Sequence, residues 1–312
     1  MEKPDLKVNL GGIALESPIL AASGPFGYGH QYRELNDFSQ LGAIIVKGVS
    51  SEPWAGNPAP RLAETASGLL NSIGLQNPGL KSFLSDDLPP LRDCGTKIIV
   101  NIVGRTIDEY AAVASGLDGI DGINGLEVNI SCPNLKAGGM AFGTDPEATH
   151  KVVSAVRQQT SIPLLVKLSP NVTDITVIAL AAEDAGADAL SLINTLSGMT
   201  IDIESGRPFL GNTFGGLSGP AILPVALKMV WQAAGAVKIP LLGMGGITSA
   251  SDVVQFLLAG ASAVAVGTGI FYNPEIVSGL KEGLVEYMVR KNICRVEDLT
   301  ALAHRGGIND EQ

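Results

Sequence analysis

Residues 240–269 read PLLGMGGITSASDVVQFLLAGASAVAVGTG, and this stretch decides the fold. Its two apolar runs, 240–245 and 263–268, lack the polar alternation of a half-exposed strand. Such runs predict strands that are buried on both faces of a parallel sheet. Ser249–Leu258, which lies between the two runs, has the pattern of a helix. A strand, a helix and a second parallel strand form a β-α-β unit, which is typical of α/β proteins.

The same alternation extends toward the N-terminus. Six further apolar runs are PILAAS (18–23), AIIVKG (43–48), KIIVNI (97–102), GLEVNI (125–130), PLLVKL (163–168) and ALSLIN (189–194). The other helices are expected at Thr106–Leu117, Asp145–Gln159, Thr173–Ala185, Pro220–Ala234 and Pro274–Arg290. Eight strands that alternate with helices predict an α/β fold of the (β/α)8 TIM-barrel type.

A doubly wound open sheet would give the same alternation, so the position of the polar residues has to decide. Polar and glycine residues cluster directly after the apolar runs, and only a barrel brings all eight strand ends to one mouth. KVNLGGIAL (7–15) predicts a small N-terminal β-hairpin around Gly11-Gly12 that covers the bottom of the barrel. No polar linker divides the chain, so residues 1–312 are expected to form a single domain.

The composition excludes several classes of protein. A net charge of −10 argues against a nucleic-acid surface, which needs a basic face. The apolar runs are far shorter than the ~20 residues that span a membrane, and the N-terminus has no apolar signal core. We therefore expect a cytoplasmic protein. The 3 cysteines and 3 histidines show no ligand spacing, so no metal site is expected.

The last two strand ends are rich in glycine. Gly245-Gly246 and Gly267-Thr268 follow the seventh and eighth runs, where barrels commonly bind phosphate through backbone N–H groups. Glycine there also permits tight turns without any ligand, but two such loops in these places favour phosphate.

Two lysines and several amides fall near strand ends. Lys47 and Lys167 each close an apolar run, so each faces either an anionic ligand or an internal salt bridge. Amides present donors and acceptors together, which suits a planar ligand, although a single one can merely cap a turn. The amides are Asn71, Asn77, Asn101, Asn129 and Asn194.

One cysteine differs in its setting from the other two. Cys132 lies in NISCPNLKAGG (129–139), a polar loop with proline and glycine, whereas Cys94 and Cys294 are expected to be structural. A loop cysteine at the mouth of a barrel can act as a base or nucleophile if its pKa is lowered. The residues therefore indicate a barrel that binds a phosphorylated cofactor and carries a cysteine acid/base.

Nine motifs are distributed over essentially the whole chain. They are ASGPFG (22–27), VKGV (46–49), NSIGLQNPG (71–79), NISCPN (129–134), VKLSPN (166–171), INT (193–195), GGLSGP (215–220), GMGGI (243–247) and VGTGIF (266–271). Together they resemble the class 1 dihydroorotate dehydrogenases, the flavin enzymes of pyrimidine synthesis. Class 2 enzymes place serine where this chain has Cys132, and LKAGGMAFGTDPE (135–147) is similar to the NAD-linked subclass 1B.

The resemblance implies a set of site residues around one flavin mononucleotide (FMN). The catalytic base would be Cys132. The FMN would meet Ser23, Lys47, Gly48, Asn101, Asn129, Lys167, Ile193, Gly219, Gly245, Gly246, Gly267 and Thr268. The substrate would meet Lys47, Asn71, Ser72, Ile73, Gly74, Leu75, Asn129, Asn194 and Thr195.

The resemblance also implies an activity and partners. Cys132 would remove the C5 proton of (S)-dihydroorotate while hydride passes from C6 to N5 of FMN, giving orotate. Electrons would reach NAD through a second subunit that carries FAD and a [2Fe–2S] cluster, in a heterotetramer built on a homodimer of this chain. The alternatives are a fumarate-linked class 1A enzyme, another FMN barrel such as a dihydrouridine synthase, a flavin-free phosphate-binding isomerase, and a scaffold subunit whose flavin is dispensable.

Overall fold

A closed barrel of eight parallel strands forms the centre of the molecule, in a computed structural model that describes residues 3–32, 37–130 and 142–307. The strands follow the order β10-β15-β16-β3-β4-β7-β8-β9 around the barrel. Seven of them lie within one of the predicted apolar runs and β4 extends one residue past its run, which confirms the predicted (β/α)8 barrel. Their bounds are β3 Ile19–Ala21, β4 Ala43–Val49, β7 Lys97–Ile102, β8 Gly125–Asn129, β9 Leu164–Lys167, β10 Ala189–Leu192, β15 Leu241–Met244 and β16 Ala263–Val266.

The barrel strands are buried along nearly their whole length, as the lack of polar alternation predicts. β8, β9, β10, β15 and β16 have no exposed position. Parallel strands of this kind are covered by side chains inside the barrel and by helices outside it.

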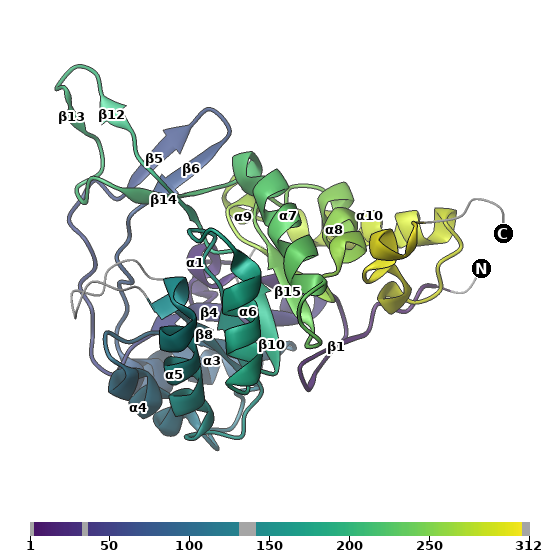
Figure 1. The fold of residues 1–312 in the computed structure, drawn as a ribbon, viewed down its shortest axis with the longest axis horizontal. Helices are drawn as coiled ribbons and strands as arrows, with labels where there is room; N and C mark the ends of the chain where they lie inside the picture. The colour runs from purple at the N-terminus through teal and green to yellow at the C-terminus, as the bar shows by residue number, and fades with distance from the viewer. Residues whose placement is uncertain (1–2, 33–36, 131–141, 308–312) are drawn as a thin grey trace.

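Helices surround the barrel (Figure 1). Side chains cap the start of three helices: Thr106, Asp145 and Asp174 each accept a hydrogen bond from a backbone N–H in the first turn of their helix. Ser249 and Asp252 form a full capping box at α8. The longer helices are α4 Ile107–Leu117, α5 Pro146–Arg157, α6 Ile175–Asp184, α7 Leu223–Ala234, α8 Ala250–Ala259 and α10 Ile276–Arg290.

Several short helices accompany the longer ones. A 3-10 turn at Pro220–Ile222 precedes α7, so the regular helix begins three residues later than expected. The segment 80–92, for which no helix was predicted, is helical throughout, with a π-helical centre at Phe83–Asp87. The short helices are α1 Ser23–Phe26, α2 Leu80–Ser82, α3 Leu88–Arg92 and α9 Gly269–Tyr272.

The predicted N-terminal hairpin is present, formed by β1 Val8–Leu10 and β2 Ile13–Leu15. Gly11 at its turn has φ +58° and lies so close to the backbone of Asp188 that a Cβ would meet its carbonyl oxygen at 2.5 Å. Asp188 directly precedes β10, so the hairpin packs against the N-terminal ends of the barrel strands. It therefore covers the bottom of the barrel, opposite the mouth.

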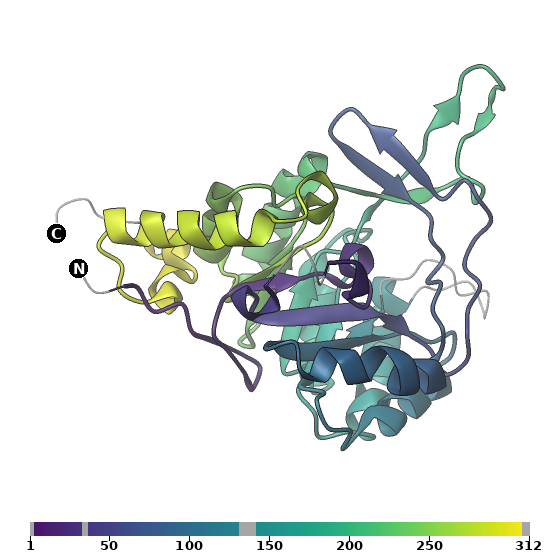
Figure 2. The same cartoon turned by 180° about the vertical axis from the view of Figure 1, so that it is seen from behind.

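A second sheet, which the sequence analysis did not predict, stands beside the mouth of the barrel. Its four antiparallel strands have the order β11-β14-β6-β5, and a separate hairpin, β12–β13, projects beyond it (Figures 1 and 2). The strands are β5 Leu62–Thr65, β6 Gly68–Asn71, β11 Leu196–Gly198, β12 Ile201–Asp202, β13 Arg207–Pro208 and β14 Gly215–Ser218. Two segments of the chain form this sheet: the segment after β4 supplies β5 and β6, and the segment after β10 supplies β11 and β14.

In the part of the chain that the structure describes, no helix is both long and apolar enough to cross a membrane.

Candidate active site

A cavity of about 660 Å³ opens at the carboxyl ends of the barrel strands, between the mouth of the barrel and the four-stranded sheet. Every described residue that the sequence predicted for the cofactor or the substrate lines this cavity. They are Ser23, Lys47, Gly48, Asn71, Ser72, Ile73, Gly74, Leu75, Asn101, Asn129, Lys167, Ile193, Asn194, Thr195, Gly219, Gly245, Gly246, Gly267 and Thr268. The barrel gathers segments that are far apart in sequence, because all its strand ends meet at one mouth.

Four adjacent strands place a polar layer beneath the cavity. Glu127, at the centre of β8, is fully buried. Its Oε2 accepts a hydrogen bond from Asn101 Nδ2 at 2.5 Å, and its Oε1 accepts one from Ser191 Oγ at 2.7 Å. Lys167 Nζ lies 3.8 Å from Oε2. Lys167 thus lines the cavity and also takes part in the internal ion pair that the sequence analysis left open as the alternative.

Lys47 has no carboxylate within ion-pair distance among the described residues. Burial lowers the pKa of its ammonium group below the ordinary value of 10.5, and the nearby positive charge of Lys167 lowers it further. Because Glu127 pairs with Lys167 and the described residues give Lys47 no counter-ion, the site favours an anionic ligand that would offset the charge of Lys47.

The two glycine loops present unused backbone donors. Gly245 has φ +126° and Gly246 φ +81°, conformations that L-residues rarely adopt. Within the described residues, the backbone N–H groups of Gly245, Gly246, Gly267 and Thr268 donate to no other group. Donors of this kind at the end of a barrel suit a phosphate.

Four of the five predicted amides line the cavity, and Asn77 does not. Asn101 Oδ1 is buried and accepts no hydrogen bond from the described protein, so it is available to a donor on a ligand. Asn129 and Asn194 meet each other at 3.5 Å, and Asn71 donates to the Gly216 carbonyl oxygen across the β6–β14 pair. These four line the cavity.

Asn77, the fifth amide, does not line the cavity. Its Oδ1 accepts from Ser50 Oγ at 2.9 Å and from the Gly79 backbone N–H at 2.9 Å. Its Nδ2 donates to the Leu75 carbonyl oxygen. The amide therefore holds the loop that precedes α2, which is the turn-stabilising role that single asparagines often have.

Cys132, the predicted catalytic base, lies outside the described residues, so its role stays a prediction. Cys94 is partly buried and Cys294 is exposed. Among the described residues, no group of three or more His, Cys, Asp or Glu side chains is placed to hold a metal ion.

Several residues that shape the site were missed by the sequence analysis. Ser218 lines the cavity and accepts a hydrogen bond from Thr268 Oγ1 at 2.7 Å, which links β14 to the glycine loop after β16. Glu127 had a detectable signal, because a carboxylate inside an apolar strand has to find a partner. Phe214 and Phe271 are exposed aromatic residues at the cavity wall, and no local pattern marks them.

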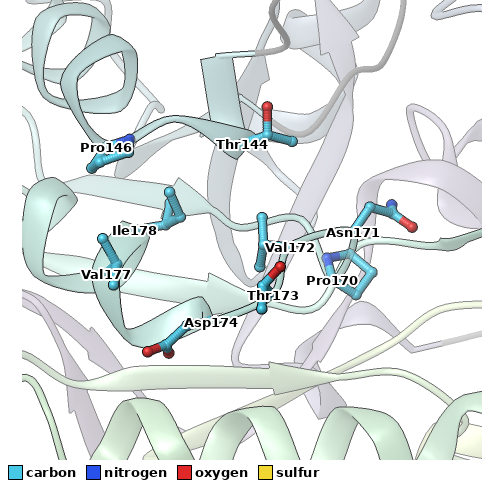
Figure 3. Close-up of a pocket in the computed structure, with 9 residues that line it drawn as sticks. All are labelled: Thr144, Pro146, Pro170, Asn171, Val172, Thr173, Asp174, Val177 and Ile178. Carbon is cyan, nitrogen blue, oxygen red and sulfur yellow. The ribbon is translucent and has the colours of Figure 1, made fainter.

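A second cavity, of about 560 Å³, lies beside the first, between the start of α5 and the loop that leads into α6 (Figure 3). Asn171 lines both cavities. Its amide donates to the Thr195 carbonyl oxygen and accepts from the Ser197 backbone N–H, so it fixes the segment that carries Thr195. Asp174, on the other side of this cavity, caps α6.

Comparison with known proteins gives a consistent result. Residues 5–288 match the family model described as dihydroorotate dehydrogenase. A protein of Geotalea uraniireducens is 54% identical over 299 residues, 96% of this chain and 98% of the relative. One of Pelobacter propionicus is 54% identical over 95% and 98% of the two chains, and one of Alkaliphilus metalliredigens 54% over 96% and 99%. All three relatives are named dihydroorotate dehydrogenase B (NAD(+)), catalytic subunit.

Proposed function

This chain belongs to the dihydroorotate dehydrogenase family, and from that premise we propose that it oxidises (S)-dihydroorotate to orotate on a bound FMN. The proposal treats residues 1–312 as one cytoplasmic FMN-binding domain that serves the synthesis of pyrimidine nucleotides. The observation that carries it is the convergence of all the described cofactor and substrate residues on one cavity.

The cavity fits FMN in three respects. Gly245, Gly246, Gly267 and Thr268 offer unpaired backbone N–H groups, which suit the phosphate. Asn101 Oδ1 is a buried acceptor without a protein donor, which suits a ring N–H group. The charges of Lys47 and Lys167 exceed that of Glu127, which suits an anionic cofactor. A volume of about 660 Å³ lies within the range of ligand pockets, ~300–1,000 Å³.

Bound FMN would supply a two-electron acceptor for the hydride that leaves the substrate. The chain's own part is to bind, to orient and to stabilise charge. Lys167, held beside Glu127, would stabilise the negative charge that reduction brings into the site. Lys47 would meet the substrate carboxylate, where an anion offsets the cost of its buried ammonium group.

The amides and the cysteine would act on the substrate. Asn71, Asn129 and Asn194 offer donors and acceptors for the amide edges of dihydroorotate, and Asn171 holds Thr195 in place beside them. We propose that Cys132 removes the C5 proton, since a thiolate is a base of suitable strength near neutral pH.

The electron acceptor is proposed from the names of the relatives, which are called catalytic subunits linked to NAD(+). With 3 cysteines, this chain has fewer thiols than the four that an iron–sulfur cluster commonly takes. We propose that a partner subunit carries FAD and a [2Fe–2S] cluster, in a heterotetramer of two catalytic and two electron-transfer chains on a homodimer core.

The surface supports assembly with another chain. Several large apolar side chains on and around β12–β13 are exposed, and clusters of this kind are typical of protein–protein contacts. They are Met199, Ile201, Ile203, Phe209 and Phe214.

The proposed function is tested by the flavin content and the turnover of the purified chain. We expect one FMN per chain and steady turnover with dihydroorotate and an artificial dye as acceptor. A colourless protein, or a yellow one without turnover, would overturn the proposal. Rapid turnover with fumarate would indicate the class 1A alternative, and activity on tRNA the dihydrouridine synthase alternative.

A further inference from the structure

Glu127 is a buried carboxylate in the polar layer beneath the cavity that no proposed step uses. Glu127 is fully buried at the centre of β8, between the apolar residues Leu126 and Val128. Asn101 pairs with Glu127 in the β7–β8 register, and Ser191 pairs with Lys167 in the β9–β10 register. Four neighbouring strands thus bring Asn101, Glu127, Lys167 and Ser191 into one inward-facing layer.

The hydrogen bonds of Glu127 fix the orientation of Asn101. Asn101 Nδ2 donates to Glu127 Oε2 at 2.5 Å, so the other end of the amide, Oδ1, has to point elsewhere. Oδ1 lies toward Gly48 at the cavity wall, where a Cβ on that glycine would meet it at 3.1 Å. Without the carboxylate, the amide has no fixed reason to present its acceptor rather than its donor to a ligand.

Glu127 also balances the charge of Lys167, whose Nζ lies 3.8 Å from Oε2. A negative charge so close to the cavity floor opposes the addition of negative charge to a ligand above it, and Lys167 favours it. The net field at the cavity floor therefore depends on both partners of the pair.

On the basis of the proposed function, we propose that Glu127 is a positioning residue of the flavin site. It holds the acceptor of Asn101 toward the cofactor and offsets the charge of Lys167, and it thereby sets how much more tightly the site holds reduced FMN than oxidised FMN. The alternative is a purely structural role, in which the network only fills the barrel.

Glu127→Gln separates these two roles. The glutamine keeps the size of the side chain, its oxygen can still accept from Asn101, and its amide can donate to the Ser191 hydroxyl group. The charge alone is lost, which leaves Lys167 without its counter-ion. We expect the preference for reduced over oxidised FMN to rise at least tenfold, equal to a positive shift of about 30 mV for a two-electron couple.

The measurement is the FMN midpoint potential by anaerobic equilibration with reference dyes, together with the dissociation constants of both FMN forms. Ser191→Ala is the matched control, because it removes a donor to Glu127 but no charge, and its potential should equal that of the wild type. A potential of Glu127→Gln equal to that of the wild type would overturn the charge-balancing role.

A second variant keeps the proposal testable if Glu127→Gln does not fold. Glu127→Asp retains the charge but withdraws the carboxylate from Asn101 by about one bond length, ~1.5 Å. We expect the affinities for both FMN forms to fall by a similar factor, between threefold and thirtyfold, with a nearly unchanged potential. Unchanged affinities would overturn the positioning of Asn101. A wild-type chain that binds no FMN would instead overturn the proposed function itself.

Discussion

Lys47 shows how a buried charge in the site lowers the stability of the folded chain without FMN. Its ammonium group lies in the cavity near Lys167, and burial and this neighbouring charge lower its pKa below 10.5. Between the lowered pKa and 10.5 the unfolded chain binds more protons than the folded one. The free energy of unfolding of the chain without FMN therefore rises with pH across that window.

Lys47→Met should remove this dependence. We expect the variant without FMN to be more stable than the wild type at neutral pH, and the difference to shrink as the pH rises toward 10.5. The measurement is urea unfolding from pH 7 to 10, with Lys81→Met, an exposed lysine of α2, as control. Parallel stability curves for wild type and Lys47→Met would contradict the prediction.

A substitution of Cys132 tests the proposed removal of the substrate proton. Cys132→Ser should retain FMN and slow the reduction of the flavin by dihydroorotate roughly 10²- to 10⁴-fold near neutral pH, since serine is a far weaker acid and supplies little base. Rapid mixing without oxygen gives the rate. The exposed Cys294 provides the control, and Cys294→Ser should behave as the wild type. An unchanged rate in Cys132→Ser would remove this cysteine from the mechanism.

At the scale of elements, the glycine loops after β15 and β16 make different demands on the backbone. Gly246 has φ +81°, and a Cβ there would lie 2.7 Å from the Leu223 Cβ and 2.9 Å from its backbone nitrogen. Gly267 has room, with no described atom nearer than 3.9 Å to its Cβ position. The first glycine is needed by the fold, whereas the second leaves its space to the cavity.

Alanine substitutions should separate these roles. Gly246→Ala should lower the free energy of unfolding by at least ~1–2 kcal/mol even without FMN, because it is strained and crowded. Gly267→Ala should leave the thermal midpoint of the FMN-free chain unchanged but weaken FMN binding, which a fluorescence titration measures. Equal stability losses in both variants would show that the two loops are merely turns.

The elements also show what the sequence can and cannot predict. All eight barrel strands were predictable, because burial on both faces leaves a continuous apolar run such as AIIVKG. The four-stranded sheet was not predictable, because two of the four residues of β14 (GGLS) are glycines and leave too few side chains to form a pattern. Its partner β6 is about 145 residues away in sequence, a pairing that no local signal marks.

Some residues of the site could likewise be predicted from the sequence, whereas others could not. Strand ends were sufficient to place Lys47, Asn101 and Gly245 around one cavity, because the barrel geometry fixes where they meet. The structural role of Asn77 and the network around Glu127 depend on hydrogen bonds between distant segments. Ser191 and Glu127, for example, are 64 residues apart. Residue type alone does not reveal such partners.

At the scale of the whole molecule, the proposed reaction is divided between two chains. We expect the purified chain to oxidise dihydroorotate with dyes but not with NAD, and to gain NAD reduction when its electron-transfer partner is added. The reason is that the site proposed here holds one flavin, and no second redox centre is proposed for this chain. Efficient NAD reduction by the chain alone, followed as the absorbance of NADH, would refute this division.

The most direct test of the central claim is a single turnover of the isolated FMN-loaded chain. When it is mixed with a slight excess of (S)-dihydroorotate in the absence of oxygen and of any acceptor, we expect complete bleaching of the flavin band and the release of one orotate per FMN. A flavin that stays oxidised while FMN remains bound would show that this chain does not oxidise dihydroorotate on its flavin.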